Sequence, residues 1–132
     1  MSAPKSPSMR TPLARVRSLG SSHSGTSDFW RQRLTAVAMT LLIVPVIVVV
    51  IMLIGRNHAG AAQMLGSIPI AIILLLFIVA STWHMKIGMQ VVFEDYIHNE
   101  KLKIACVMAN NFFCVAVALA SIYAILKLSS GV

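Results

Sequence analysis

Three long apolar runs dominate the sequence, and each is long enough to cross a lipid bilayer as a helix. They cover residues 34–54, 62–93 and 104–126. The first has 21 residues without a charge, about 31 Å of helix, which matches the hydrocarbon thickness of a bilayer. Pro45 lies within it and is expected to kink the helix. The second would be about 48 Å long, so we expect it to tilt or project from the membrane. The pattern predicts an all-α integral membrane fold with three transmembrane helices.

The first 28 residues have a different composition. They contain eight serines, three prolines and no acidic residue before Asp28. Such a segment cannot bury a core, so we expect a disordered basic tail over 1–28 and a three-helix anchor domain over 29–132. The Arg- and Ser-rich composition also fits an organelle transit peptide, so bacterial and organellar origins both stay open. The retained cytoplasmic tail of a bacterial protein is the simpler interpretation.

The overall composition excludes a water-soluble enzyme. Apolar residues make up 58% of the chain and charged residues 11%, whereas soluble domains are about a quarter charged. The net charge of +7 does not indicate a nucleic-acid partner, because six of the eleven basic residues precede the first apolar run instead of covering a polar face. Cys106 and Cys114 lie eight residues apart in one predicted helix, about 12 Å along its axis, which is too far for a disulfide.

Lysine and arginine are divided unequally between the two sides of the predicted membrane domain. The side that holds the N-terminus and the 94–103 link carries eight of them, and the opposite side carries Arg56 and Lys127. Because basic residues are retained in the cytoplasm, this distribution predicts a cytoplasmic N-terminus and a periplasmic C-terminus in a bacterial inner membrane.

Polar side chains are concentrated in the second apolar run, where each needs a partner or a purpose. At 100° per residue, His84, Gly88 and Asp95 lie within 40° of one another on one face of a helix. An imidazole ligates haem iron, and a residue without a side chain nearby lets a flat macrocycle approach. The alternative is a histidine that bonds a neighbouring helix, with Gly88 as a close helix contact. If haem binds, another chain must supply its second ligand.

Asp95 and Tyr96 end the same predicted helix, and Arg33 begins the first helix on the same side of the membrane. A phenol, a carboxylate and a guanidinium at one interface can donate hydrogen bonds and protons to a carbonyl group. Tyrosine and arginine are also common membrane-interface anchors, and an aspartate there is commonly solvated. Asn110 and Asn111, inside the third run, are expected to join helices through hydrogen bonds.

Two segments of the chain resemble a known family. Residues 84–96 (HMKIGMQVVFEDY) are similar to the H-x-x-x-G-x-x-x-x-x-x-D-Y motif in the second helix of the succinate dehydrogenase membrane anchor, the D-type subunit. Residues 29–36 (FWRQRLTA) resemble the entry to that family's first helix in its alphaproteobacterial form. The three-helix layout and the basic segment before the first helix also agree with this family.

The resemblance implies a four-chain succinate:ubiquinone oxidoreductase in the lipid bilayer. A flavoprotein subunit would oxidise succinate, and an iron–sulfur subunit would carry the electrons to two small anchors, a C-type companion and this chain. His84 would be one axial ligand of a haem b shared with the companion, with Gly88 at the haem approach. Tyr96 would donate a hydrogen bond to a carbonyl of ubiquinone, with Asp95 and Arg33 around it. The chain alone would not be catalytic.

Two rival functions are considered beside this one. The first is a haem-free structural anchor that only docks a peripheral enzyme. The second is a small transporter or proton channel, which is poorly supported because no acidic relay crosses the bilayer centre.

Overall fold

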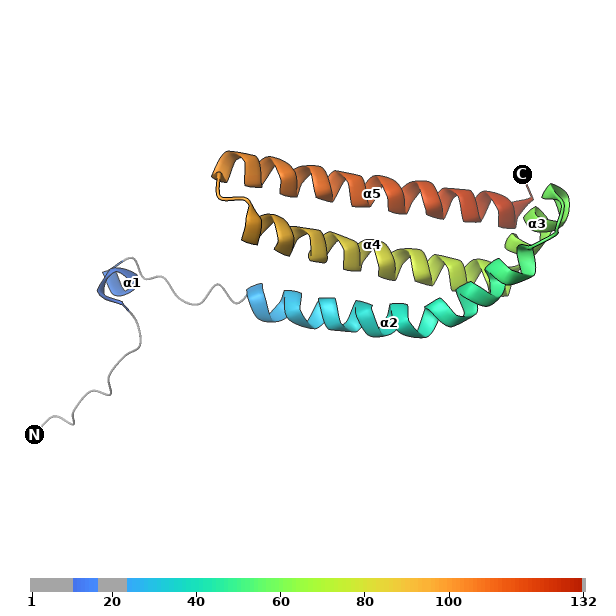
Figure 1. Ribbon diagram of the computed structural model, residues 1–132, viewed down its shortest axis with the longest axis horizontal. Helices are drawn as coiled ribbons and strands as arrows, with labels where there is room; N and C mark the ends of the chain where they lie inside the picture. The colour runs from blue at the N-terminus through green and yellow to red at the C-terminus, as the bar shows by residue number, and fades with distance from the viewer. Residues whose placement is uncertain (1–10, 17–23, 132) are drawn as a thin grey trace, which may run out of the picture.

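The computed structural model describes residues 11–16 and 24–131, and every regular element in these ranges is a helix (Figure 1). The helices are α1 (Pro12–Val16), α2 (Ser24–Leu53), α3 (His58–Leu65), α4 (Ile68–Tyr96) and α5 (Glu100–Ser130). Three of them contain segments long and apolar enough to cross a membrane, at Thr26–Leu53, Ile68–Tyr96 and Glu100–Ser130. The all-α class and the number of candidate spans, three, are confirmed.

The three long helices lie side by side, with α4 between α2 and α5 (Figure 1). Both outer helices run antiparallel to α4, so the start of α2, the end of α4 and the start of α5 share one end of the molecule. The short helix α3 lies at the opposite end, where it contacts α4 and α5. Helix α2 remains one helix across Pro45 and bends as it approaches α3 (Figure 1).

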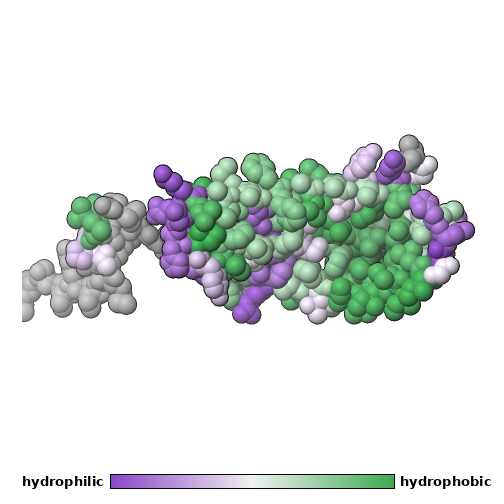
Figure 2. Space-filling model, turned by 45° about the horizontal axis from the view of Figure 1, so that its top comes forward, coloured by the Kyte–Doolittle hydropathy of each residue, from purple (hydrophilic) through white to green (hydrophobic). Residues whose placement is uncertain are grey.

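The described part of the chain has a very small core. Its buried residues are Val49, Met64, Ala71, Ala80, Thr82, Ile87, Asn110 and Cys114. Large apolar side chains instead cover the outside, and Figure 2 shows a broad hydrophobic surface between two hydrophilic ends. Exposing such a surface to water costs free energy, whereas exposing it to the hydrocarbon of a bilayer does not. The exposed apolar side chains therefore fit a lipid environment.

The sequence analysis expected the second apolar run, residues 62–93, to form one helix, but the structure divides it between two helices. The chain breaks at Gly66 and Ser67, and α4 begins at Ile68. Pro69 accounts for the break, because it has no N–H for a helical bond and its ring clashes with the carbonyl of residue 65. The Gly66 N–H and the Ser67 hydroxyl close α3 on the carbonyls of Ala62 and Met64, at 2.9 and 2.7 Å.

The helices also extend beyond the predicted spans at the end shared by α2, α4 and α5. Helix α2 starts at Ser24, and three residues, 97–99, join α4 to α5. Asn99 permits this tight connection, because its side chain accepts hydrogen bonds from the Lys101 and Leu102 N–H groups at the start of α5. Of the predicted tail, residues 1–10 and 17–23 lie outside the described residues, whereas α1 and the first turn of α2 are helical.

Asn110 links α5 to α4 at the middle of the membrane domain. Its Nδ2 donates to the backbone carbonyl of Lys86 at 2.9 Å, and its side chain is buried. Cys114, one turn further along α5, donates through Sγ to the Oδ1 of Asn110 at 3.5 Å. Cys106 and Cys114 are both free thiols, as the spacing predicted.

Candidate functional site

His84 lies at the interface of α4 and α2, and both of its ring nitrogens meet side chains of α2. Nδ1 lies 3.1 Å from the Oγ1 of Thr35, and Nε2 lies 3.4 Å from the amide Nε2 of Gln32. The two α2 residues are three positions apart, so they occupy the same helix face and reach the ring together. The ring is therefore held in a defined orientation by α2.

Gly88 lies one turn beyond His84 and faces the same part of α2. A Cβ added there would meet the Gln32 amide nitrogen at 3.4 Å, an ordinary van der Waals contact with the far end of a flexible side chain. The Gln32 amide therefore occupies the space beside both Gly88 and the Nε2 of His84. The Oε1 of Gln32 is buried and has no hydrogen-bond partner within the described residues.

These observations test whether the site suits a haem. The Nδ1 of His84 is already hydrogen-bonded to Thr35. Metal-ligating histidines commonly have such a bond on the ring nitrogen that does not bind the metal. Within the described residues, the hydrogen-bonding partner of the other nitrogen is the Gln32 amide, at 3.4 Å. The oxygen of the same Gln32 amide is buried without a hydrogen-bond partner among the described residues, so the present position of this side chain is only weakly stabilised. The residues fit a planar group that approaches Nε2 over Gly88 once the Gln32 side chain turns away.

No second histidine of the described chain lies near His84. His58 is the first residue of α3, at the opposite end of the molecule, and His98 lies in the link between α4 and α5. His23 lies outside the described residues. The described residues also contain no group of three or more side chains suited to hold a metal ion. A six-coordinate haem on His84 would need its other axial ligand from another chain.

The structure places Asp95 and Tyr96 together at the end of α4, but Arg33 lies elsewhere. Tyr96 is 79% exposed and Asp95 is exposed. Because Gln32 lies beside Gly88, Arg33 is at the level of Gly88, about 10 Å along the axis before Asp95. Sequence analysis placed Arg33 at the start of the first helix, whereas α2 begins nine residues earlier.

The two arginines near the start of α2 have different partners. Arg33 places its guanidinium carbon 4.4 Å from the ring centre of Phe29, one turn nearer the end of the molecule. Arg31 lies 3.8 Å from the carboxylate of Asp28. The Arg33 side chain is thus directed toward the end of the molecule where α4 ends.

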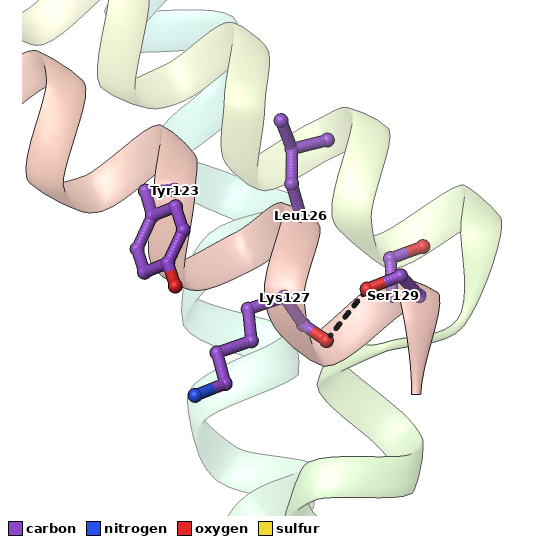
Figure 3. Close-up of a pocket in the computed structure, with 5 residues that line it drawn as sticks. Tyr123, Leu126, Lys127 and Ser129 are labelled. Atoms are coloured by element: carbon purple, nitrogen blue, oxygen red, sulfur yellow. Dashed lines mark hydrogen bonds between the residues drawn. The ribbon is translucent and has the colours of Figure 1, made fainter. Parts of the chain in front are cut away.

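Lys86 lies on the other side of α4 from His84. It lines an open groove of about 260 Å³ between α4 and α5, together with Trp83 and Cys114. A larger hollow of about 580 Å³ lies near the C-terminal end of α5, lined by Tyr123, Lys127 and neighbouring residues (Figure 3). None of the predicted site residues lines either of these hollows.

Comparison with known proteins decides the family. The profile of the succinate dehydrogenase/fumarate reductase transmembrane subunit family matches residues 7–118. The chain belongs to this family. Its members are subunits of oxidoreductase complexes, so the chain is the membrane anchor of such a complex.

Curated relatives agree with the assignment to the succinate dehydrogenase/fumarate reductase transmembrane subunit family. The succinate dehydrogenase hydrophobic membrane anchor subunit of Paracoccus denitrificans is 30% identical over 92% of this chain and 93% of its own length. The subunit of the same name from Rickettsia conorii is 28% identical over 88% and 93%. The succinate dehydrogenase membrane anchor subunit of Reclinomonas americana is 32% identical over 64% and 72%. No solved structure matches the chain.

Two residues beside His84 were absent from the sequence-based site. Gln32 and Thr35 lie on α2, about 50 positions before His84, and a helical wheel of α4 does not identify residues of a neighbouring helix. One signal for them was present, because both are polar residues spaced three apart at the start of an apolar span. Such residues commonly face a partner and not lipid.

Proposed function

We propose that the chain is an anchor subunit of a bacterial inner-membrane succinate dehydrogenase that supplies His84 as one axial ligand of a haem b. The other ligand comes from a C-type companion anchor. The chain also contributes Tyr96 and Asp95 to a site where ubiquinone is reduced. An iron–sulfur subunit and a flavoprotein complete the complex.

The observation that carries the haem assignment is the setting of His84. An ionisable ring at bilayer depth is held by a hydrogen bond to Nδ1, with Gly88 one turn away, and the family membership gives the complex in which such a ring is useful. A bound haem supplies a one-electron carrier within the membrane. His84 orients its Nε2 toward that group, and the α2–α4 interface holds the ring.

The quinone assignment depends on location and family. Reduction of a quinone takes two electrons and two protons, so the site must meet both an electron donor and water. Tyr96 and Asp95 lie at the polar end of α4, beside the charged start of α5. The Tyr96 hydroxyl donates to a quinone carbonyl, and Asp95 links that site to water. Arg33 lies further along the membrane domain and adds positive charge without direct contact.

One observation favours the haem-free anchor as a second candidate. The Gln32 amide fills the space beside Gly88 and opposes the Nε2 of His84, so the interface is packed without any cofactor. In this second function, His84 serves only to join α2 and α4. The haem spectrum of the unmodified complex distinguishes the two functions.

The test is His84→Ala in the purified complex, with His58→Ala as the matched control. We expect His84→Ala to remove the low-spin haem spectrum, because an axial ligand is lost, while the complex still assembles. Gly88→Leu should perturb the same spectrum, since a branched side chain would enter the approach to Nε2. A normal low-spin spectrum in assembled His84→Ala would overturn the ligand assignment, and a complex without haem in the unmodified protein would support the haem-free anchor.

A further inference from the structure

We propose that Thr35 is a positioning residue that keeps the proton of the His84 ring on Nδ1 and leaves Nε2 free to ligate iron. The inference rests on the proposed function of His84 as a haem ligand and extends it to a residue of another helix. It assigns a role to a side chain that the H-x-x-x-G motif does not contain.

The first argument is the single proton of the Thr35 hydroxyl. Its Oγ1 lies 2.8 Å from the carbonyl oxygen of Arg31 and 3.1 Å from that of Gln32. A carbonyl oxygen cannot donate, so a contact as short as 2.8 Å requires the hydroxyl proton to point at it. Oγ1 then has only lone pairs to offer the His84 ring at 3.1 Å. Nδ1 must therefore carry a proton and donate it to Thr35.

The second argument comes from the other ring nitrogen. The group nearest to the Nε2 of His84 is the amide nitrogen of Gln32, at 3.4 Å. An amide nitrogen donates and does not accept. With the amide placed in this way, the lone pair of Nε2 accepts from the Gln32 N–H and this nitrogen carries no proton. The contacts of the two nitrogens thus point to the same tautomer, the one that ligates metal through Nε2.

The third argument concerns how firmly Thr35 holds its position. A threonine has a branched Cβ with restricted rotamers, and its bond to the preceding turn of α2 fixes the hydroxyl further. Gln32 is held less firmly, because its Oε1 is buried without a partner among the described residues. Thr35 therefore keeps its hydrogen bond to Nδ1 when haem binds. The Gln32 amide contacts the lone pair of Nε2 that would ligate iron, so this side chain must move away before haem binds.

The consequence is a specific electronic effect. A hydrogen bond from Nδ1 raises the basicity of the ligating nitrogen, and the loss of such an outer-sphere partner typically costs about 10–100-fold in metal affinity. A less basic ligand stabilises ferric iron less than before. Loss of the Thr35 hydroxyl should therefore weaken haem binding, and it should weaken the binding of ferric haem more than that of ferrous haem. The midpoint potential then rises by about 59 mV for each factor of ten by which the loss of ferric affinity exceeds the loss of ferrous affinity.

The experiment compares three variants in the assembled complex. Thr35→Val keeps the shape and removes the acceptor, Thr35→Ser keeps the hydroxyl, and Thr40→Val is the matched control. Thr40 is also in α2 and also bonds the preceding turn, to the Ala36 carbonyl at 2.9 Å, but it is exposed. We expect haem affinity to fall about 10–100-fold and the potential to rise in Thr35→Val, with near-normal values in the other two.

The outcomes separate this inference from the function on which it rests. If Thr35→Val matches Thr40→Val while His84→Ala loses the haem spectrum, then Thr35 has no positioning role although His84 remains the ligand. If His84→Ala keeps the spectrum, the ligand assignment itself fails.

A second measurement needs no variant. Nitrogen-15 NMR of the full chain in detergent, labelled at histidine and without haem, should show the His84 proton on Nδ1. A proton found on Nε2 would overturn the inference whether or not the variants assemble.

Discussion

Asn110 and Asn111 are neighbours in the sequence, but their side chains have different surroundings. Asn110 is 8% exposed and donates to the Lys86 carbonyl of α4, whereas the buried Oδ1 of Asn111 has no partner within the described residues. The sequence predicted that both would join helices. Of these two asparagines, Asn110 is the one whose side chain bonds α4 within the described residues.

Asn110→Ala should destabilise the chain by about 1 kcal/mol, which is typical for a hydrogen bond between membrane helices. Asn111→Ala should have little effect, because it removes an oxygen that has no partner. The measurement is the midpoint of unfolding in a detergent titration of the full chain. Equal midpoints for the two variants would show that the contact between Asn110 and Lys86 is not a stabilising one.

Tyr96→Phe tests the quinone site, because it keeps the ring and removes only the hydroxyl. Loss of one hydrogen-bond donor to a developing negative charge typically costs about 3 kcal/mol, or roughly a hundredfold in rate. We expect succinate-to-quinone turnover to fall by about this factor, while succinate oxidation with an artificial acceptor upstream is unchanged. Tyr123→Phe, on exposed α5 at the other end of the molecule, is the control. Normal quinone turnover in assembled Tyr96→Phe would identify the tyrosine as an interface anchor.

At the scale of the elements, the division between α3 and α4 depends on a close contact. Gly66 ends α3, and a Cβ at this position would overlap the backbone carbonyl of Leu128 in α5. The carbonyl belongs to a helix backbone and cannot move aside alone. The absence of a side chain at Gly66 is what lets the end of α3 touch the last turns of α5.

Gly66→Ala should therefore separate α3 from α5 and destabilise the chain by about 1–3 kcal/mol, as expected for overpacking. Gly60→Ala is the comparison, because its Cβ would meet only the Oδ1 of the Asn57 side chain, at 3.0 Å. Thermal unfolding of the complex in detergent measures both. A Gly66→Ala complex as stable as the unmodified one would mean that the contact between α3 and α5 is not tightly packed.

The sequence predicted these elements unevenly. Length and hydropathy were sufficient for three spans, and helical period was sufficient to place His84 and Gly88 on one face. The ends of each helix could not be predicted from the apolar pattern, because helix caps such as Asn99 and helix breakers such as Pro69 act locally and override that pattern. The level of Arg33 relative to Asp95 could not be predicted, since it depends on the register between two helices, which no single-helix pattern contains.

At the scale of the whole molecule, the structure groups basic residues by end as the sequence did. The start of α2 and the link that precedes Lys101 and Lys103 share one end of the molecule (Figure 1). Arg56 follows α2 and Lys127 lies in the last turn of α5, both at the opposite end. We expect this unequal charge to orient the three helices in the membrane, with the more basic end in the cytoplasm.

A pair of reporter fusions tests this orientation. A reporter fused after residue 132 should be exported to the periplasm, and one inserted near Asn99 should stay in the cytoplasm. At each of the two positions, the measurement compares the activity of a reporter enzyme that works only after export with that of one that works only in the cytoplasm. The opposite pattern would reverse the chain in the membrane and move Tyr96 away from the cytoplasmic side.

The position of α4 between its two neighbours has a consequence for the order in which the molecule forms during synthesis. Each long helix packs against the one made just before it, because α4 contacts α2 and α5 contacts α4. Such contacts need little chain to be closed into loops, which favours rapid folding. The pair formed by Thr35 and His84 can therefore meet as soon as α4 enters the bilayer, while α5 is still in the ribosome. The contact of α3 with α5 closes last and completes the chain.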